Sequence, residues 1–354
     1  MSASPLKRRL WIGGAVLALL LFGMGALIAY TTWNDVNRVT IDRPSSEDSG
    51  GPVAQPDEEG EEPAGDEEVE VVDPGSQVFL LVGSDSREDL EDTAGFGDFE
   101  GNRADVVMVL FKEPTKTGLL SIPRDLLVDS PCGGSDTKVS EMLEGCPPFN
   151  GPTLLTVAVE RLIGKRVDHF ALVDLVGFQE AVDAVGGYEI CVENPVRDAR
   201  ANLELPAGCT MADGAQTLAW MRSRRTQELT DDGWRTMSGI NDLARNERQR
   251  SFLIDMMSRA GDITSPAAMT SAAQAVAPYV TVDSELSILD AVNLAMTMRG
   301  LQSGGIVEIE IPVFDATTDG GAAVLRPAEP VDEIVADFLA SADADAGVLL
   351  GVAG

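Results

Sequence analysis

Apolar and polar positions divide the chain into an apolar run, a polar stretch and a long patterned region. Residues 10–30 form the apolar run and include no charged residue. As a helix, these 21 residues would span about 30 Å, the thickness of the hydrocarbon core of a bilayer. Residues 31–76 contain Pro, Gly, Ser and acidic residues with little to bury, which is typical of a disordered linker. Apolar residues recur with regular spacings from Gln77 onward, where a folded domain is predicted to begin.

The patterned region alternates short apolar runs with segments of helical spacing. Runs of five or six apolar residues ended by Gly or Pro are typical of buried strands, and a 3.6-residue period predicts helices. Strands alternating with helices predict an α/β fold, in which a central mixed sheet is flanked by helices. The predicted strands are 78–82, 106–111, 118–122, 169–173, 188–192 and 306–311. The predicted helices are 153–163, 176–185, 212–221, 240–259, 282–298 and 331–339.

These patterns predict six segments along the chain. A cytoplasmic tail and a transmembrane helix come first, and an acidic flexible linker separates them from a catalytic domain. An α/β extension packed on that domain and a flexible tail complete the chain. The predicted boundaries are 1–9, 10–30, 31–76, 77–262, 263–340 and 341–354.

Charges on either side of the apolar run predict its orientation. Lys7, Arg8 and Arg9 precede the run and an acidic stretch follows it. Basic residues favour the cytoplasmic side, so we expect a single-pass membrane protein whose domain lies outside the cytoplasm. The alternative is a cleaved signal peptide, but the run is long for one and no clear small-x-small cleavage site ends it.

The charge distribution points to a local anion site. The formal net charge of −32 argues against nucleic acid as a partner, because phosphate backbones bind clustered positive surface. Residues 44–75 hold twelve Asp or Glu and no Lys or Arg, whereas residues 222–250 hold seven arginines. A concentrated basic patch in an acidic protein therefore predicts an anionic ligand.

Four cysteines fit an oxidising, extracytoplasmic compartment: Cys132, Cys146, Cys191 and Cys209. A zinc cluster is not favoured, because no close CxxC pair is present and the chain has one histidine. Two disulfides are expected instead. Three connectivities are open, and the pairs nearest in sequence would each staple a loop; the alternative is four reduced, buried thiols.

One histidine removes most hydrolase schemes that rest on a Ser–His or Cys–His pair. His169 lies in an apolar predicted strand, where a packed, hydrogen-bonded role is favoured over catalysis. The sequence also has no Walker-type glycine loop. Any chemistry must therefore come from carboxylates, arginines and a metal ion.

Four polar segments offer such groups at the ends of predicted elements. Asp85 and Arg87 follow the first strand, Arg103 and Asp105 precede the second, and Arg124 closes the third. Each segment alone is typical of an exposed surface, but clustered arginine forks imply a polyanion such as a phosphate group. Carboxylates beside them suit Mg²⁺ or Mn²⁺. The fourth segment supplies Arg222, Arg224, Arg245, Arg248 and Gln249, the last three on one helical face.

In this order, the polar segments resemble the LytR–CpsA–Psr family of cell-wall ligases. The likeness covers about residues 77–260, with weaker agreement to about residue 313, and the membrane anchor also fits. The matching pieces are GSDSR at 83–87, RAD at 103–105, LSIPRD at 120–125, Lys138, the helix with its double glycine at 178–187, LPAG at 205–208, QTLAW at 216–220, RSR at 222–224, Arg245, Arg248 and Gln249.

The resemblance implies a glycopolymer transferase with the αβα sandwich of that family. Such an enzyme takes a polymer from a polyprenyl pyrophosphate and attaches it to peptidoglycan, as a phosphodiester on the muramic acid 6-hydroxyl. Asp85 and Asp105 would ligate Mg²⁺, and with Arg103, Arg124 and Arg245 they would form the catalytic centre. An apolar cavity between sheet and helices would receive the polyprenyl tail. The implied pyrophosphate contacts are Arg87, Lys138, Arg222, Arg224, Arg248 and Gln249.

Several points stay open in the sequence. Ser140 stands where the family usually has asparagine, which puts the acceptor side of the site in doubt. The cysteines and the alanine-rich composition are similar to actinobacterial members, for which arabinogalactan would be the expected polymer. The alternatives to a transferase are a polyprenyl-pyrophosphate hydrolase with water as acceptor, and a non-catalytic wall-binding or signalling ectodomain.

Overall fold

The structure is a computed structural model of the 354-residue chain. It describes residues 33–43, 75–84, 102–223, 225–237, 265–291, 293–294 and 306–341, with 248, 251–252, 255–256 and 259. The predicted membrane span, most of the acidic stretch and most of the predicted helix at 240–259 lie outside these residues. Within them, no helix has the length and apolar character needed to cross a membrane.

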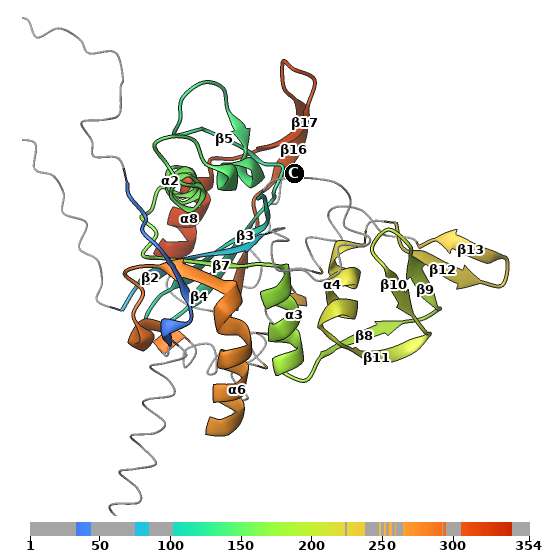
Figure 1. Cartoon of the computed structure of the whole chain (residues 1–354). Helices are drawn as coiled ribbons and strands as arrows, with labels where there is room; N and C mark the ends of the chain where they lie inside the picture. The colour runs from blue at the N-terminus through green and yellow to red at the C-terminus, as the bar shows by residue number, and fades with distance from the viewer. Residues whose placement is uncertain are drawn as a thin grey trace, which may run out of the picture.

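A seven-stranded mixed sheet forms the centre of the fold, as predicted (Figure 1). The strand order is β1-β14-β7-β2-β3-β4-β15. β7 and β2 run parallel, whereas β2, β3 and β4 form an antiparallel meander. The bounds are β1 (Asn37–Val39), β14 (Val280–Asp283), β7 (His169–Val173), β2 (Gln77–Ser84), β3 (Ala104–Lys112), β4 (Thr117–Ile122) and β15 (Ile306–Ile309).

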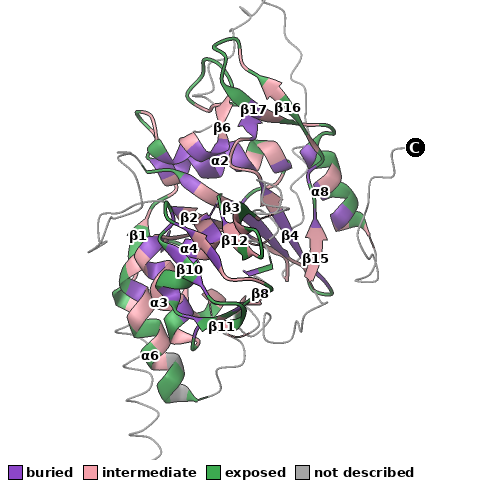
Figure 2. Ribbon diagram, turned by 90° about the vertical axis from the view of Figure 1, so that its right-hand side faces the viewer, coloured by how far each residue is buried: buried purple, intermediate pink, exposed green. Residues whose placement is uncertain are grey.

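Helices cover both faces of this sheet (Figures 1 and 2). α2 (Gly151–Ile163) and α8 (Val331–Ala340) bury Leu155 and Phe338 against Leu80 of β2 on one face. Successive strand residues point to opposite faces, so Phe79 packs on the other side with Met108. That side carries α3 (Leu175–Ala184) and α6 (Pro266–Val276), and α4 (Gly214–Arg222) packs against α3.

Local sequence signals fix the helix ends. Asn150 Oδ1 accepts a hydrogen bond from Thr153 N and begins α2, which ends at Gly164 with a left-handed φ of 65°. Asp213 and Gln216 form a capping box at the start of α4. α4 ends at Arg222, a predicted site residue.

A smaller lobe of short strands lies beside α4 (Figure 1). Its own core includes Ile190, Val196 and Leu203. Of its strands, the sequence predicted only the one at 188–192. The lobe contains β8 (Tyr188–Val192) paired with β11 (Gly208–Ala212), and the sheet of β10 (Leu203–Leu205), β9 (Val196–Asp198), β12 (Gln227–Thr230) and β13 (Gly233–Thr236).

Both disulfides join the cysteines that are nearest in sequence. Cys191 lies directly opposite Cys209 across β8 and β11. Cys132–Cys146 closes a loop that holds β6 and η1. The remaining elements are β5 (Leu127–Val128), β6 (Thr137–Lys138), η1 (Val139–Glu144), η2 (Ala277–Tyr279), β16 (Val313–Thr317) and β17 (Ala323–Pro327).

Three predictions from the sequence are wrong. The linker was placed at 31–76, yet β1 within it is part of the central sheet and pairs with β14. The predicted helix at 282–298 starts too early, because 282–283 belong to β14; helical residues begin at 288. A domain boundary at 262 does not hold either, because β14 lies inside the same sheet and β15 forms its far edge. Segment 263–340 is therefore integral to the domain that holds the central sheet, not an extension packed on it.

Candidate functional site

The predicted polar segments converge because of the sheet topology. In the antiparallel meander, Gly83 lies opposite Val106 and Val107 lies opposite Ile122. Parallel β7 places Val173 opposite Gly83. The ends of β2, β4 and β7 and the start of β3 therefore meet at one edge of the sheet. Open α/β sheets bind ligands at the carboxyl ends of their strands.

A β-bulge presents Asp105 at this edge. Gly83 pairs with Val106, whereas the next residue, Ser84, pairs with Ala104, so Asp105 is an extra residue in β3. A bulge bends its strand and re-aims a side chain, and bulges recur beside active sites. The carboxylate of Asp105 is 39% exposed there.

Arg124, just after β4, lies between two carboxylates. Its Nη1 donates a hydrogen bond to Asp105 Oδ1 over 2.6 Å, and its Nε lies 3.4 Å from Asp125 Oδ2. Lys138 Nζ donates to Asp125 Oδ1 over 2.7 Å. We call Asp105, Arg124, Asp125 and Lys138 the charged row. Because the signs alternate, two cations lie near each other without net repulsion.

Arg124 and Asp125 keep their charges at neutral pH. Burial disfavours the charged guanidinium of Arg124, but the carboxylates of Asp105 and Asp125 outweigh burial and raise its pKa above the ordinary value. Burial also raises the pKa of the Asp125 carboxyl. The hydrogen bond from Lys138 and the charge of Arg124 outweigh this effect, and the pKa of Asp125 is lowered below its usual value.

An apolar pocket of about 160 Å³ opens beside the charged row, between the sheet and helices α3 and α4. Asp105 belongs to both features, and Arg222 lines the pocket from the end of α4. The site can therefore hold a molecule with an apolar body and an anionic head. The apolar walls include Leu81, Met108, Leu175, Phe178, Leu218 and Phe252.

Comparison with known proteins decides the family. Over residues 53–336 the chain matches the LytR_cpsA_psr family. The chain belongs to the LytR–CpsA–Psr family. The match covers both the charged row and the apolar pocket, as well as segment 263–336, in agreement with one continuous sheet.

Individual LytR–CpsA–Psr relatives agree with this assignment. The probable cell wall biosynthesis protein LcpB of Corynebacterium glutamicum is 36% identical over 261 residues, which are 69% of this chain and 56% of the relative. The chain thus spans little more than half of that protein. The polyisoprenyl-teichoic acid–peptidoglycan teichoic acid transferase TagU of Oceanobacillus iheyensis is 30% identical over 272 residues, 73% of this chain and 72% of TagU. The fold is similar to a solved LytR-Csp2A-Psr enzyme from Actinomyces oris, with a TM-score of 0.58, 24% identity and coverage of 74% and 89%.

Two further predicted residues of this LytR–CpsA–Psr chain lie around the site with other partners. Arg103 Nε, at the start of β3, is 3.3 Å from Glu144 Oε1, and both side chains are about half exposed, at 49% and 46%. Arg248 donates from Nη1 and Nη2 to the carbonyl oxygens of Trp220 and Ser223, each over 3.1 Å. Burial lowers the pKa of Arg248 below its usual value. Its phosphate contact stays a prediction beside this backbone role.

The described residues supply one of the two predicted metal ligands. Mg²⁺ is usually bound by one or two carboxylates together with phosphates and water, so the partly exposed carboxylate of Asp105 fits such a site. Within the described part of the chain, no group of three or more His, Cys, Asp or Glu is arranged to hold a metal. The other predicted ligand is among the candidates outside that part, whose roles stay predictions: Asp85, Arg87, Arg224, Arg245 and Gln249.

Sequence reasoning missed part of the pocket wall. Asp174 lines the pocket and caps α3, where its Oδ1 accepts a hydrogen bond from Gly177 N over 2.7 Å. An aspartate before a helical pattern is a capping signal, but it does not show which cavity the cap faces. No spacing rule predicts that Phe252 lines the pocket, because its position there depends on how distant segments pack.

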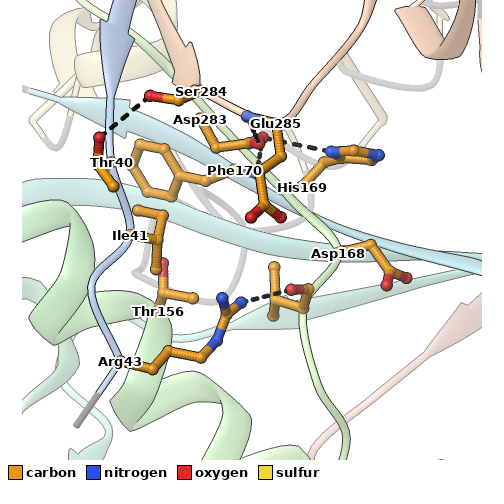
Figure 3. Close-up of a pocket in the computed structure, with 11 residues that line it drawn as sticks. Thr40, Ile41, Arg43, Thr156, Asp168, His169, Phe170, Asp283, Ser284 and Glu285 are labelled. Atoms are coloured by element: carbon orange, nitrogen blue, oxygen red, sulfur yellow. Dashed lines mark hydrogen bonds and ion pairs between the residues drawn. The ribbon is translucent and has the colours of Figure 1, made fainter.

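The single histidine has the packed role predicted for it. His169 Nδ1 lies 3.4 Å from Asp283 Oδ2 (Figure 3). The His169 ring centroid is 5.2 Å from that of Phe79. Asp283 also accepts a hydrogen bond from Phe170 N over 3.0 Å. The cavity around them is only about 30 Å³, too small for a substrate.

Proposed function

We propose that this protein transfers a glycopolymer from a polyprenyl pyrophosphate carrier to the muramic acid 6-hydroxyl of peptidoglycan. The observation that carries the proposal is the apolar pocket joined to the charged row through Asp105. A polyprenyl pyrophosphate has the same two parts, an apolar chain and a diphosphate. The name of TagU, which describes transfer of a polyisoprenyl-linked polymer to peptidoglycan, supports this reading.

The transfer is a single displacement at phosphorus. The acceptor hydroxyl oxygen forms a bond to the phosphorus that carries the polymer, and the bond from that phosphorus to the bridging oxygen breaks. The polymer becomes a phosphodiester on peptidoglycan, and the hydroxyl proton ends on the leaving prenyl monophosphate. Negative charge builds on the phosphoryl oxygens and on the leaving group, so positive groups at fixed positions lower the barrier.

The site residues have distinct roles in this scheme. Arg124 and Arg222 bind and neutralise the diphosphate, since guanidinium forks match phosphate oxygens. Lys138, which donates a hydrogen bond to Asp125 at the end of the charged row, provides a further cation near the reacting phosphorus. Asp105, with Asp85, would hold Mg²⁺, and a bound Mg²⁺ would supply additional charge stabilisation to the phosphates.

The membrane placement belongs to the proposal. We infer that residues 10–30 anchor the chain and that the domain lies outside the cytoplasm, where carrier and peptidoglycan are both present. Anchoring raises the effective concentration of the enzyme near a lipid substrate. The two disulfides support an oxidising compartment. Arabinogalactan stays the expected polymer.

A reconstituted reaction tests the function. The full chain in liposomes is supplied with a lipid-linked glycopolymer, Mg²⁺ and peptidoglycan, and polymer bound covalently to peptidoglycan is measured. We expect attached polymer and prenyl monophosphate in equal amounts. Polymer released without attachment would establish a hydrolase. If neither attached nor released polymer is found, the non-catalytic ectodomain is the remaining reading. In the same reaction Arg124→Met should lose transfer. Arg161→Met is its control, because Arg161 of α2 forms an ion pair with Asp129 and lies outside the pocket lining.

A further inference from the structure

A buried carboxylate lies beneath the turn that carries the pocket arginine. Arg222, the last residue of α4, lines the pocket, and with Ser223 and Arg225 it forms what we call the arginine turn. Asp198, the last residue of β9, is only 5% exposed and is not among the pocket residues. It lies 25 residues before Ser223 in the sequence, yet it binds this turn directly.

Asp198 holds the arginine turn with two hydrogen bonds and accepts a third from Arg200, its near neighbour in sequence. Its Oδ2 accepts from Ser223 Oγ over 2.7 Å and from Arg225 N over 3.1 Å, and its Oδ1 accepts from Arg200 N over 3.0 Å. Burial raises the pKa of Asp198, but these bonds outweigh it and the pKa is lowered below the usual value. The carboxylate therefore remains ionised at neutral pH and acts only as an acceptor.

The hydroxyl groups above Asp198 form a directed chain. Ser223 and Thr226 are both fully buried, and their hydroxyls share a hydrogen bond. Because Ser223 has one hydroxyl proton and gives it to Asp198, the bond between the hydroxyls must be donated by Thr226. A chain with one consistent direction fixes the rotamers of both side chains.

Arg248 secures the same turn from its other side. Its two donors bind Trp220 O and Ser223 O, and its guanidinium lies 4.9 Å from the ring centroid of Trp220. Ser223 is therefore held by its side chain through Asp198 and by its carbonyl through Arg248. In the sequence, Arg222 lies between Trp220 and Ser223, the two residues whose carbonyl oxygens Arg248 binds.

We propose that Asp198 is a positioning residue, which acts through Ser223 to aim Arg222 at the anionic head of the ligand in the pocket. This inference rests on the proposed function. A displacement of about 1 Å in a catalytic group can lower a rate about 100-fold. The gain from precise placement of Arg222 can therefore outweigh the cost of burying the carboxylate of Asp198. In Asp198→Asn an uncharged amide replaces the carboxylate: its one oxygen can accept on one side only, and its N–H₂ faces a donor on the other, so the hold on the turn weakens.

The test compares two ligands on the full chain in detergent. Binding of a prenyl pyrophosphate and of the matching prenyl alcohol is measured by calorimetry for wild type, Asp198→Asn and Ser223→Ala. We expect both variants to bind the pyrophosphate at least tenfold more weakly, with unchanged affinity for the alcohol, because the apolar walls stay intact. The double variant should lose no more than the larger single loss, since both residues act through one contact.

Asp283→Asn is the matched control. Asp283 is also a buried carboxylate, 4% exposed, which accepts backbone hydrogen bonds and has a lowered pKa, but it lies outside the pocket lining. It should lose thermal stability without a change in pyrophosphate affinity. If Asp198→Asn is too unstable to measure, Ser223→Ala decides alone. Wild-type affinity for pyrophosphate in the folded variants, or equal losses for both ligands, would overturn the positioning role. A wild-type protein that binds neither ligand would instead contradict the proposed function.

Discussion

Filling the apolar pocket gives the sharpest test of how the ligand is held. Leu218 of α4 is 5% exposed and lines the pocket opposite Leu81 and Met108 of the sheet. In Leu218→Trp, the larger ring would occupy the space between helix and sheet. We expect the variant to fold, since the pocket offers room for the ring, but to exclude the polyprenyl chain.

The size of the effect follows from the volume of the pocket. At about 160 Å³ it holds about five groups of water size, at ~30 Å³ each, which is one isoprene unit of five carbons. Burial of each such carbon stabilises by about 0.8 kcal/mol, or about 4 kcal/mol in all. Each 1.4 kcal/mol is about tenfold in affinity, so the upper limit is a loss of roughly 1,000-fold.

The assay is calorimetric titration with a prenyl pyrophosphate and with inorganic pyrophosphate. Leu218→Trp should weaken binding of the prenylated ligand by roughly 100- to 1,000-fold and leave inorganic pyrophosphate unchanged. Leu218→Met, which conserves volume, is the control and should resemble wild type. A folded Leu218→Trp protein with prenyl pyrophosphate affinity within threefold of wild type would refute the assignment of the pocket.

Three other predictions test the charged row, a disulfide and the histidine. Arg124→Met should lower the transfer rate about 100- to 1,000-fold, the usual effect of losing one charge-stabilising donor, and a rate within fivefold of wild type would contradict its role. Replacing Cys191 and Cys209 with Ala should cost about 3 kcal/mol of unfolding free energy, measured by denaturant titration; no loss would show that the bond is dispensable. The contact with Asp283 raises the pKa of His169 above 6.5 although burial opposes it. The stabilisation from His169 is therefore complete below pH 6.5 and is lost as the pH rises through the folded-state pKa, so His169→Gln should flatten the decline of melting temperature in that range; an unchanged pH profile would exclude this linkage.

Elements with a strong local pattern were predictable from the sequence. The strands at His169–Val173 and Tyr188–Val192 have the predicted bounds, because each is a compact run with clear flanking signals. β9, β10, β12 and β13 are only three or four residues long and carry no such run. β9 pairs with β10 and β12 with β13 as short hairpins, and the pairing of β9 with β12, with Gln227 opposite Arg197, joins them into one sheet. That last pairing links distant segments, which no local window contains. β14 was missed for two reasons. Its strand partners, β1 and β7, are distant in sequence, and its last two residues fall in a segment of helical spacing.

The candidate site divides in the same way. Asp105 and Arg124 were predictable because each adjoins a recognisable strand, and neighbouring antiparallel strands bring such ends together. The bulge that aims Asp105 was not predictable, because it is a property of the pairing between β2 and β3. Asp198 was missed because its partners are more than twenty residues away and its own neighbourhood shows no motif.

The charged row would allow a protein with a net charge of −32 to maintain the proposed diphosphate site. Arg124 has ionic contacts to two carboxylates before any ligand is present, so the cations do not repel one another in the resting state. These side chains are partly exposed, and ion pairs of that kind contribute at most about 1 kcal/mol each. A diphosphate offers more acceptor oxygens and more charge than one carboxylate, so it can compete for the guanidinium of Arg124. The same exchange would release the Asp105 oxygen that Arg124 now holds. Weak pairs between strong charges therefore suit this site better than either unpaired arginines or a buried, permanent salt bridge.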